Sequence, residues 1–137
     1  MRKTILLCTM FLGFLAFAQQ KSPVLGGDKD VHGCKGSAGY TYSQIKNDCV
    51  RVFEQKIKLK EISSDKSYTS MTAVIFSKDM KKAEVFIPYE NAQSIILERA
   101  GKSKMWKSGS YIKEAYVLVP FKKKGYQIKK DNIVIYQ

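Results

Sequence analysis

The chain has 137 residues, of which 24 are Lys or Arg and 12 are Asp or Glu, so its formal net charge at pH 7 is +12. This length fits one compact domain with a modest hydrophobic core. Nearly all of the positive charge is Lys, which indicates either a well-solvated surface or attraction to an anionic partner such as lipid headgroups, acidic glycan or nucleic acid. We expect no membrane-spanning helix, because the longest apolar run has about 13 residues and a span needs about 20.

The first 18 residues have the features of a secretory signal peptide. Arg2 and Lys3 form a short positive segment, residues 5–17 are almost wholly apolar, and residues 16–18 give the small-x-small pattern that signal peptidase reads. We predict cleavage after Ala18, which leaves 119 residues with 22 basic and 12 acidic side chains. The protein is therefore expected to be exported, soluble after cleavage, and either periplasmic or secreted.

Two cysteines, Cys34 and Cys49, remain after this cleavage. An even pair of cysteines in an exported protein indicates a disulfide. The bond would close a loop of about 15 residues and contribute about 3 kcal/mol in the chain-entropy model. The third cysteine, Cys8, follows Leu7, whereas lipoprotein cleavage needs a small residue at that point, so we do not expect a lipid anchor.

The predicted domain plan has three parts. Residues 1–18 are the signal peptide, residues 19–33 are an extended lead-in, and residues 34–137 form one β domain that includes the disulfide module. After a glycine-containing loop, Thr41 or Ser43 can cap a helix, and no Gly or Pro follows for several residues. We predict one short helix over about Tyr42–Val50, held to the loop by the disulfide.

From Arg51 onward the pattern indicates β-strands. In residues 57–60 Ile and Leu alternate with Lys, and six further segments are rich in Val, Ile, Tyr and Phe. The turn clusters between them are too closely spaced for intervening helices, so neighbouring strands must be antiparallel. The prediction is a mainly β fold, an antiparallel meander of about seven to eight strands that closes into a small barrel or a sandwich. Residues 93–100 would also suit a helix, but β-branched Ile95 and Ile96 favour a strand.

The chain offers little for catalysis or metal binding. His32 is the only imidazole, Cys34 is expected to be oxidised, and Ser37 lacks the glycines that frame a nucleophile elbow. Asp28 and Asp30 have the spacing that opens a calcium loop, but a Gly stands at its twelfth position, where a bidentate Glu is expected. We therefore expect no enzymatic activity, no metal site and no cofactor.

Aromatic residues alternate with Lys along much of the chain. Aromatic platforms in cationic grooves bind single-stranded nucleic acid on barrel folds, and similar platforms bind sugars. Tyr is also a normal cross-strand partner in half-buried sheets. We adopt this second interpretation, so nucleic acid is not expected as a partner.

Residues 33–51 resemble a short module of exported bacterial proteins. The module has the pattern G-C-x-x-S-A-G-Y-x-W, followed by C-x-R, and Tyr42 stands here in the Trp position. The resemblance covers about 20 residues. It implies no activity, and it supports the predicted disulfide.

Residues 105–119, MWKSGSYIKEAYVLV, are similar to the C-type lysozyme inhibitor family through Trp106 and Gly109. The resemblance implies an exported eight-stranded antiparallel barrel that inserts a Ser-Gly-x-x-Tyr loop and a Lys into the cleft of the enzyme. In this chain residues 108–111 are one residue shorter than that loop, and Lys107 is the nearest match for the inserted Lys. C-type lysozymes are generally basic, and a basic chain would be repelled by them at long range.

These observations leave two binding hypotheses, with a structural accessory domain as a third. In the first, the turn from Lys104 to Tyr111 contacts a protein partner in the envelope, such as a lysozyme-like enzyme. In the second, two Lys-rich turns, 122–125 and 129–132, contact anionic envelope polymer or lipid. The strand between these turns would span only about 13 Å, so we expect the turns to lie close together. Lys at sheet edges also deters aggregation. The candidate binding residues are Trp106, Lys107, Ser108, Gly109, Tyr111, Lys122, Lys123, Lys124, Lys129 and Lys130.

Overall fold

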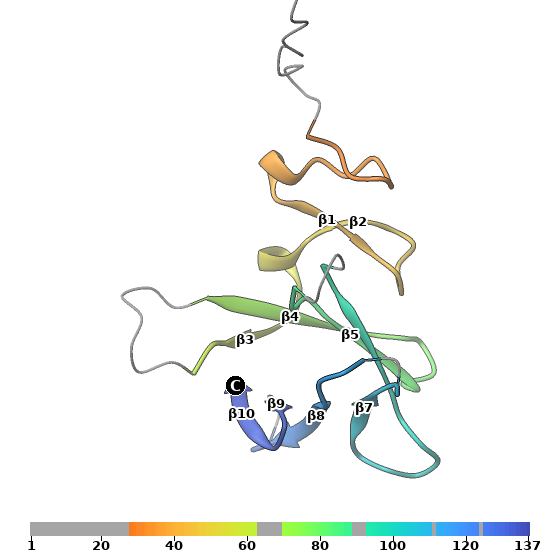
Figure 1. Cartoon of the computed structure of the whole chain (residues 1–137), viewed down its shortest axis with the longest axis vertical. Coiled ribbons are helices and arrows are strands. Elements are labelled where there is room, and N and C mark those ends of the chain that lie inside the picture. The colour runs from red at the N-terminus through yellow and green to blue at the C-terminus, as the bar shows by residue number, and fades with distance from the viewer. Residues whose placement is uncertain (1–27, 63–69, 89–92, 111, 124) are drawn as a thin grey trace, which may run out of the picture.

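The computed structural model describes residues 28–62, 70–88, 93–110, 112–123 and 125–137. The predicted signal peptide lies outside the described residues. Eight strands form one antiparallel sheet in which each strand pairs with the next one along the chain, so the predicted mainly β meander is confirmed (Figure 1). The strands are β3 (Ile57–Lys60), β4 (Met71–Phe76), β5 (Lys82–Val85), β6 (Ile95–Glu98), β7 (Trp106–Ser108), β8 (Tyr116–Phe121), β9 (Gly125–Lys130) and β10 (Ile133–Tyr136).

The sheet curls until its first and last strands meet. The backbone N–H of Lys60 donates to the carbonyl of Gln137 at 2.8 Å, and Gln137 donates back to Lys60 at 2.9 Å. An antiparallel bridge between Glu61 and Tyr136 continues this pairing. The result is a nearly closed barrel of eight strands, which satisfies backbone groups that an open sheet would leave unpaired at its edges.

Alternating side chains fill the interior of the barrel. On β3 Leu59 is buried while Lys58 and Lys60 are exposed, as the alternation in the sequence predicted. Leu97, Leu118 and the other buried members of the main core come from strands β3 to β9 or the loops beside them, and partly buried Ile135 and Tyr136 of β10 pack against this core. Removing a Val, Leu or Ile side chain from water in this way contributes about 1.5–3 kcal/mol. The buried core residues are Leu59, Val74, Ala83, Val85, Ile87, Ile95, Leu97, Trp106, Ile112, Tyr116, Leu118 and Ile128.

The predicted helix over Tyr42–Val50 is wrong, because this segment is a β-hairpin. β1 (Tyr40–Ser43) pairs in antiparallel register with β2 (Asp48–Arg51). The turn between them, residues 44–47, ends at Asn47, whose φ of 53° lies in the left-handed region that Asn tolerates. The lack of Gly and Pro made the turn look helical, although the flanking Tyr, Thr and Val residues suit a strand.

The predicted disulfide is confirmed. It joins Cys34, in the loop before the hairpin, to Cys49 on β2, and the two Cα atoms are 5.5 Å apart. The loop contains η1 (Gly36–Ala38), a single 3₁₀ turn, and η2 (Val52–Glu54) is a second such turn between β2 and β3. Within the residues that the structure describes, no helix is long and apolar enough to cross a membrane.

The hairpin covers the outer face of the barrel at β4 and β5, away from β8, β9 and β10 (Figure 1). Val50 of β2 packs there in a second core with Ala73 and Ile75 of β4 and with Phe86. Because Val74 points into the barrel core, β4 is buried on both faces. This explains why its sequence is an apolar run rather than an alternation.

A buried carboxylate on β5 fastens the hairpin turn to the barrel. Glu84 has no exposed surface. It accepts hydrogen bonds from the hydroxyls of Ser43 and Ser94 at 2.6 and 2.7 Å, and from the backbone N–H groups of Gln44 and Ile45 at 2.9 and 3.2 Å. Burial of a carboxylate is costly unless such bonds replace those it made to water. The three bonds from Ser43, Gln44 and Ile45 therefore fix where the hairpin sits on the barrel, and the bond from Ser94 holds the carboxylate from the barrel side.

Candidate functional site

Three turns of the meander meet at one end of the barrel. Successive strands reverse direction, so the β4–β5, β6–β7 and β8–β9 connections fall at the same end. Phe76, Trp106 and Tyr126 each stand next to one of these connections. Their ring centroids are 4.9 Å apart for Phe76–Trp106, 5.1 Å for Phe76–Tyr126 and 6.1 Å for Trp106–Tyr126. The three turns therefore adjoin one another around a shared aromatic cluster.

Cationic side chains dominate these three turns. The segments 77–82, 98–105 and 121–123 contain eight cationic residues and two acidic ones, Asp79 and Glu98. Asp79 lies 4.0 Å from Lys81, and Glu98 lies 3.6 Å from Lys82. We call this surface the basic end, and its cations are Lys78, Lys81, Lys82, Arg99, Lys102, Lys104, Lys122 and Lys123.

Most cations of the basic end are open to solvent. All of them are exposed except Arg99, which is partly buried with its guanidinium 5.4 Å from the ring centroid of Trp106. The ammonium of Lys122 lies 4.9 Å from the ring centroid of Phe121. Apart from Lys81 and Lys82, the lysines of the basic end form no ion pair with a carboxylate among the described residues. These unpaired lysines are Lys78, Lys102, Lys104, Lys122 and Lys123.

The opposite end of the barrel has a different charge balance. Counted with the terminal residues of the adjoining strands, as at the basic end, its described residues include three acidic side chains, Glu61, Glu114 and Asp131, and three cations, Lys60, Lys113 and Lys130. The carboxylate of Glu114 also forms an ion pair of 2.7 Å with Lys130 of β9. In the described part of the chain, positive charge is thus concentrated at one end of the barrel, which gives the electrostatic field a direction.

The two lysine groups predicted to lie close together are separated. Lys122 and Lys123 are in the turn before β9 at the basic end, whereas Lys124 lies outside the described residues. Lys129 and Lys130 are the last two residues of β9, which has six residues rather than the expected four or so. Lys130 is paired with Glu114 at the far end of the barrel, so Lys122 and Lys123 do not share one surface with Lys129 and Lys130.

Trp106, predicted to contact a partner, is a core residue. Its side chain is only 3% exposed, and its indole N–H donates to the backbone carbonyl of Met80 at 2.9 Å. A buried indole normally finds such an acceptor. The side chain of Trp106 is therefore not available at the surface of this fold.

The residues that follow Trp106 differ in their accessibility. Lys107 is exposed. The hydroxyl of Ser108 accepts a hydrogen bond of 3.1 Å from the backbone N–H of Tyr116. Gly109 is partly buried, and Tyr111 lies outside the described residues. Among the described residues from Trp106 to Gly109, Lys107 therefore offers the exposed side chain for a protein contact.

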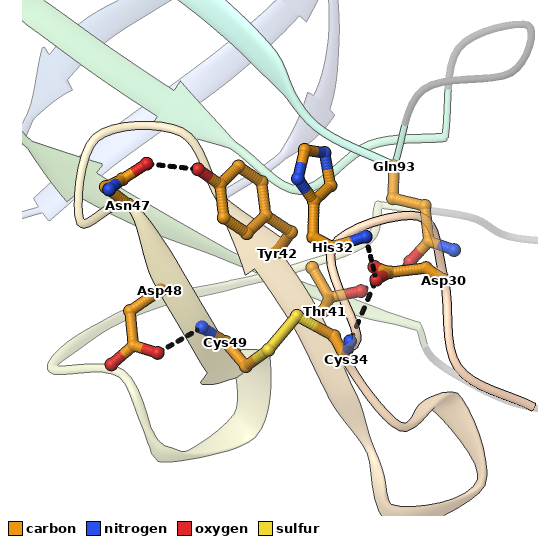
Figure 2. Close-up of a disulfide and its surroundings, with 9 residues drawn as sticks. All are labelled: Asp30, His32, Cys34, Thr41, Tyr42, Asn47, Asp48, Cys49 and Gln93. Carbon is orange, nitrogen blue, oxygen red and sulfur yellow. Dashed lines mark hydrogen bonds between the residues drawn. A yellow bond between two sulfur atoms is a disulfide. The ribbon is translucent and has the colours of Figure 1, made fainter.

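A hollow in the protein surface lies where the disulfide-bonded segment meets the barrel. The ring of His32 stacks on Tyr42 with the ring centroids 3.7 Å apart and the planes 9° from parallel (Figure 2). The hydroxyl of Tyr42 donates in turn to Asn47. The hollow has a volume of about 340 Å³, and Gln44 and Gln93 contribute to its wall. Its lining combines apolar and polar groups, and it carries no concentration of charge comparable with that of the basic end.

The acidic residues near His32 hold the loop together. Asp30 accepts the backbone N–H groups of His32 and Cys34 at 2.9 and 2.8 Å (Figure 2). Asp28 accepts the N–H of Ser37 at 2.7 Å, and hydrogen bonding from Ser37 lowers the pKa of Asp28. Across the described part of the chain, no three His, Cys, Asp or Glu side chains are grouped to hold a metal ion.

Most of the basic end is not evident from the amino-acid sequence alone. Lys104 was included in the predicted protein-binding turn, but the other cations of the β4–β5 and β6–β7 connections form modest clusters within a chain rich in Lys and gave no separate prediction. A usable signal was present in the predicted meander. In such a fold every second connection lies at the same end, and alternate connections here are the Lys-rich ones.

Comparisons of the chain with protein-family models, with curated proteins and with solved structures gave no match.

Proposed function

We propose that this protein is an exported, non-catalytic binding protein that contacts an anionic surface through the basic end of its barrel. The observation that carries the proposal is the convergence of three turns with eight cationic and two acidic residues. The signal-like segment and the Cys34–Cys49 disulfide support an exported location. The anionic surface is either an acidic polymer or the headgroups of a lipid layer, both of which present many closely spaced negative charges.

The chemistry of the basic end suits such a surface. Seven of its eight cations are Lys, a hydrated point charge that interacts with diffuse negative charge without demanding a fixed geometry. Charges on adjoining turns act together because the Debye length at physiological salt is about 8 Å. A partner with many charges gains from all of them, whereas a small anion reaches only one or two.

Retention on immobilised heparin, used as a generic polyanion, tests the proposal. The test variant combines Lys102→Gln, Lys104→Gln and Lys122→Gln. The matched control combines Lys56→Gln, Lys58→Gln and Lys60→Gln, three exposed lysines in and beside β3. Both variants lose the same charge, so a contact at the basic end predicts elution at clearly lower salt for the test variant alone. Equal elution of the two variants contradicts the proposal, because net charge would then explain retention.

A protein-binding role like that of the C-type lysozyme inhibitors is the second candidate. The nearly closed barrel of eight antiparallel strands has the architecture that this resemblance implies, although a fold alone does not establish a function. With Trp106 buried, the contact would fall to Lys107 and the loop after Ser108. Inhibition of a C-type lysozyme at high salt, where electrostatic effects are screened, supports this candidate. Lysozyme activity that is unaffected by an excess of the protein at any salt concentration rules it out.

A further inference from the structure

We propose that the partner of the basic end is the surface of an anionic lipid bilayer. This inference rests on the function proposed above and selects the lipid alternative. It starts from apolar side chains that stand exposed among the cations. Met105 is 41% exposed in the β6–β7 loop, directly after Lys104. A single exposed apolar residue needs no explanation, but this one lies where three Lys-rich turns meet.

The β8–β9 turn adds apolar surface at the same place. Pro120 is exposed and Phe121 is partly exposed, and Lys122 follows them directly. The pairing of Trp106 with Leu118 places the start of β7 against β8. Met105, directly before Trp106, therefore lies near Pro120 and Phe121, which follow Leu118. Apolar and cationic side chains are interleaved on neighbouring turns, not segregated.

Interleaving of this kind matches the boundary between the headgroups and acyl chains of a bilayer. Apolar side chains enter the boundary, while Lys side chains lay their aliphatic stems along it and keep their ammonium groups at the phosphates. Anionic lipids attract each nearby Lys, so several such residues act additively. A dissolved acidic polymer offers the same negative charge but no apolar layer, and exposed Met105 would gain nothing from it.

The aromatic cluster beneath the turns supports docking as a rigid unit. Phe76, Trp106 and Tyr126 connect the three turns through ring contacts in the barrel interior. The partly buried Arg99 lies over Trp106 and joins the β6–β7 loop to this cluster. Because the turns are held in place before binding, contact with a bilayer costs little ordering of the backbone.

Sedimentation with vesicles tests the inference. The vesicles contain phosphatidylcholine alone or phosphatidylcholine with phosphatidylglycerol, and the test variant is Met105→Gln. Its matched control is Met71→Gln, which is 42% exposed at the start of β4, at the opposite end of the barrel. The wild type should bind the anionic vesicles only. Met105→Gln should weaken this binding about ten-fold, whereas Met71→Gln should leave it unchanged.

The lysine variant and heparin together distinguish failure of the lipid assignment from failure of the proposed function. The combined Lys102→Gln, Lys104→Gln and Lys122→Gln variant should lose vesicle binding on the order of a hundred-fold. Retention on heparin should not respond to Met105→Gln. If Met105→Gln binds anionic vesicles as well as the wild type while the lysine variant loses heparin retention, the lipid assignment is overturned and the polymer remains. If the wild type binds neither vesicles nor heparin, the proposed function itself fails.

Discussion

The hydroxyl of Ser43 on β1 donates a hydrogen bond of 2.6 Å to the carboxylate of Glu84 on β5, and both side chains are completely buried. The two residues belong to different parts of the fold, the disulfide-bonded hairpin and the barrel. Glu84 also accepts two backbone N–H groups from the hairpin turn. This carboxylate is therefore the polar centre of the contact between hairpin and barrel.

Replacing Glu84 with Gln should destabilise the protein although the side chain keeps its size. The amide nitrogen is a donor, so it cannot accept the bonds that one carboxylate oxygen now accepts, and buried donors lose their partner. We expect the free energy of unfolding to fall by about 1.5–3 kcal/mol, measured by urea denaturation. Glu98→Gln, an exposed change on the neighbouring strand β6, is the control and should have little effect. Equal midpoints for the two variants would contradict this role of Glu84.

The disulfide should stabilise the protein by restricting its unfolded chain. The cysteines are 15 residues apart, and a loop of this length is worth about 3 kcal/mol in the chain-entropy model. Replacing both Cys34 and Cys49 with Ser should lower the melting temperature by several degrees. A reducing agent should lower the melting temperature of the wild type and leave that of the variant unchanged. Detection of two reactive thiols in the native protein would show that the bond does not form.

The sequence predicted the barrel better than it predicted the hairpin. The alternation in β3 and the apolar run of β4 follow directly from which faces are buried, so pattern alone located them. The hairpin turn has no Gly or Pro, and bonds from a residue 40 positions away hold it in place. β7 has only three residues and was read as part of a turn. In these cases long-range contacts, which no local pattern encodes, decide the structure.

Trp106 should report a rigid barrel interior in fluorescence experiments. It is the only Trp in the chain, and 3% of its side chain is exposed. We expect blue-shifted emission and weak quenching by acrylamide in the native state, with strong quenching in urea. Trp106→Ala should cost about 3–5 kcal/mol of stability through the cavity it leaves. Strong native-state quenching by acrylamide would mean that the indole is at the surface, where the sequence-based hypothesis placed it.

Acid should weaken the ion pair between Glu114 and Lys130. The hydrogen bond from Lys130, and after it that from Tyr116, lowers the pKa of Glu114. A carboxylate with a lowered pKa in the folded state stabilises the fold above its ordinary pKa and loses this contribution as the pH falls through the lowered value. The difference in melting temperature between the wild type and Lys130→Gln should therefore be largest at neutral pH and shrink on acidification. Lys129→Gln, one residue earlier on β9, should show no such pH dependence.

The candidate site was harder to predict than the fold because it is an assembly of separate turns. The lysine cluster of the turn 122–125 is visible in the sequence and was proposed from it as a charged surface. Lys78 and Lys102 join it only because the barrel closes and alternate connections meet. Conversely, Lys130 was a candidate for binding an anionic partner, but in the structure its ammonium forms an ion pair with Glu114. The number of charges along the chain does not distinguish a lysine that joins the basic end from one that is paired with a carboxylate.

Chemical footprinting of lysines in the wild-type protein tests the central claim, that the basic end is the surface that meets an anionic partner. Acetylation rates would be measured by mass spectrometry with and without anionic vesicles, and again with heparin. We predict selective protection of Lys78, Lys102, Lys104, Lys122 and Lys123, with unchanged rates at Lys56, Lys58 and Lys60 in and beside β3. Uniform protection of all exposed lysines, or protection confined to residues away from the three converging turns, would contradict the claim.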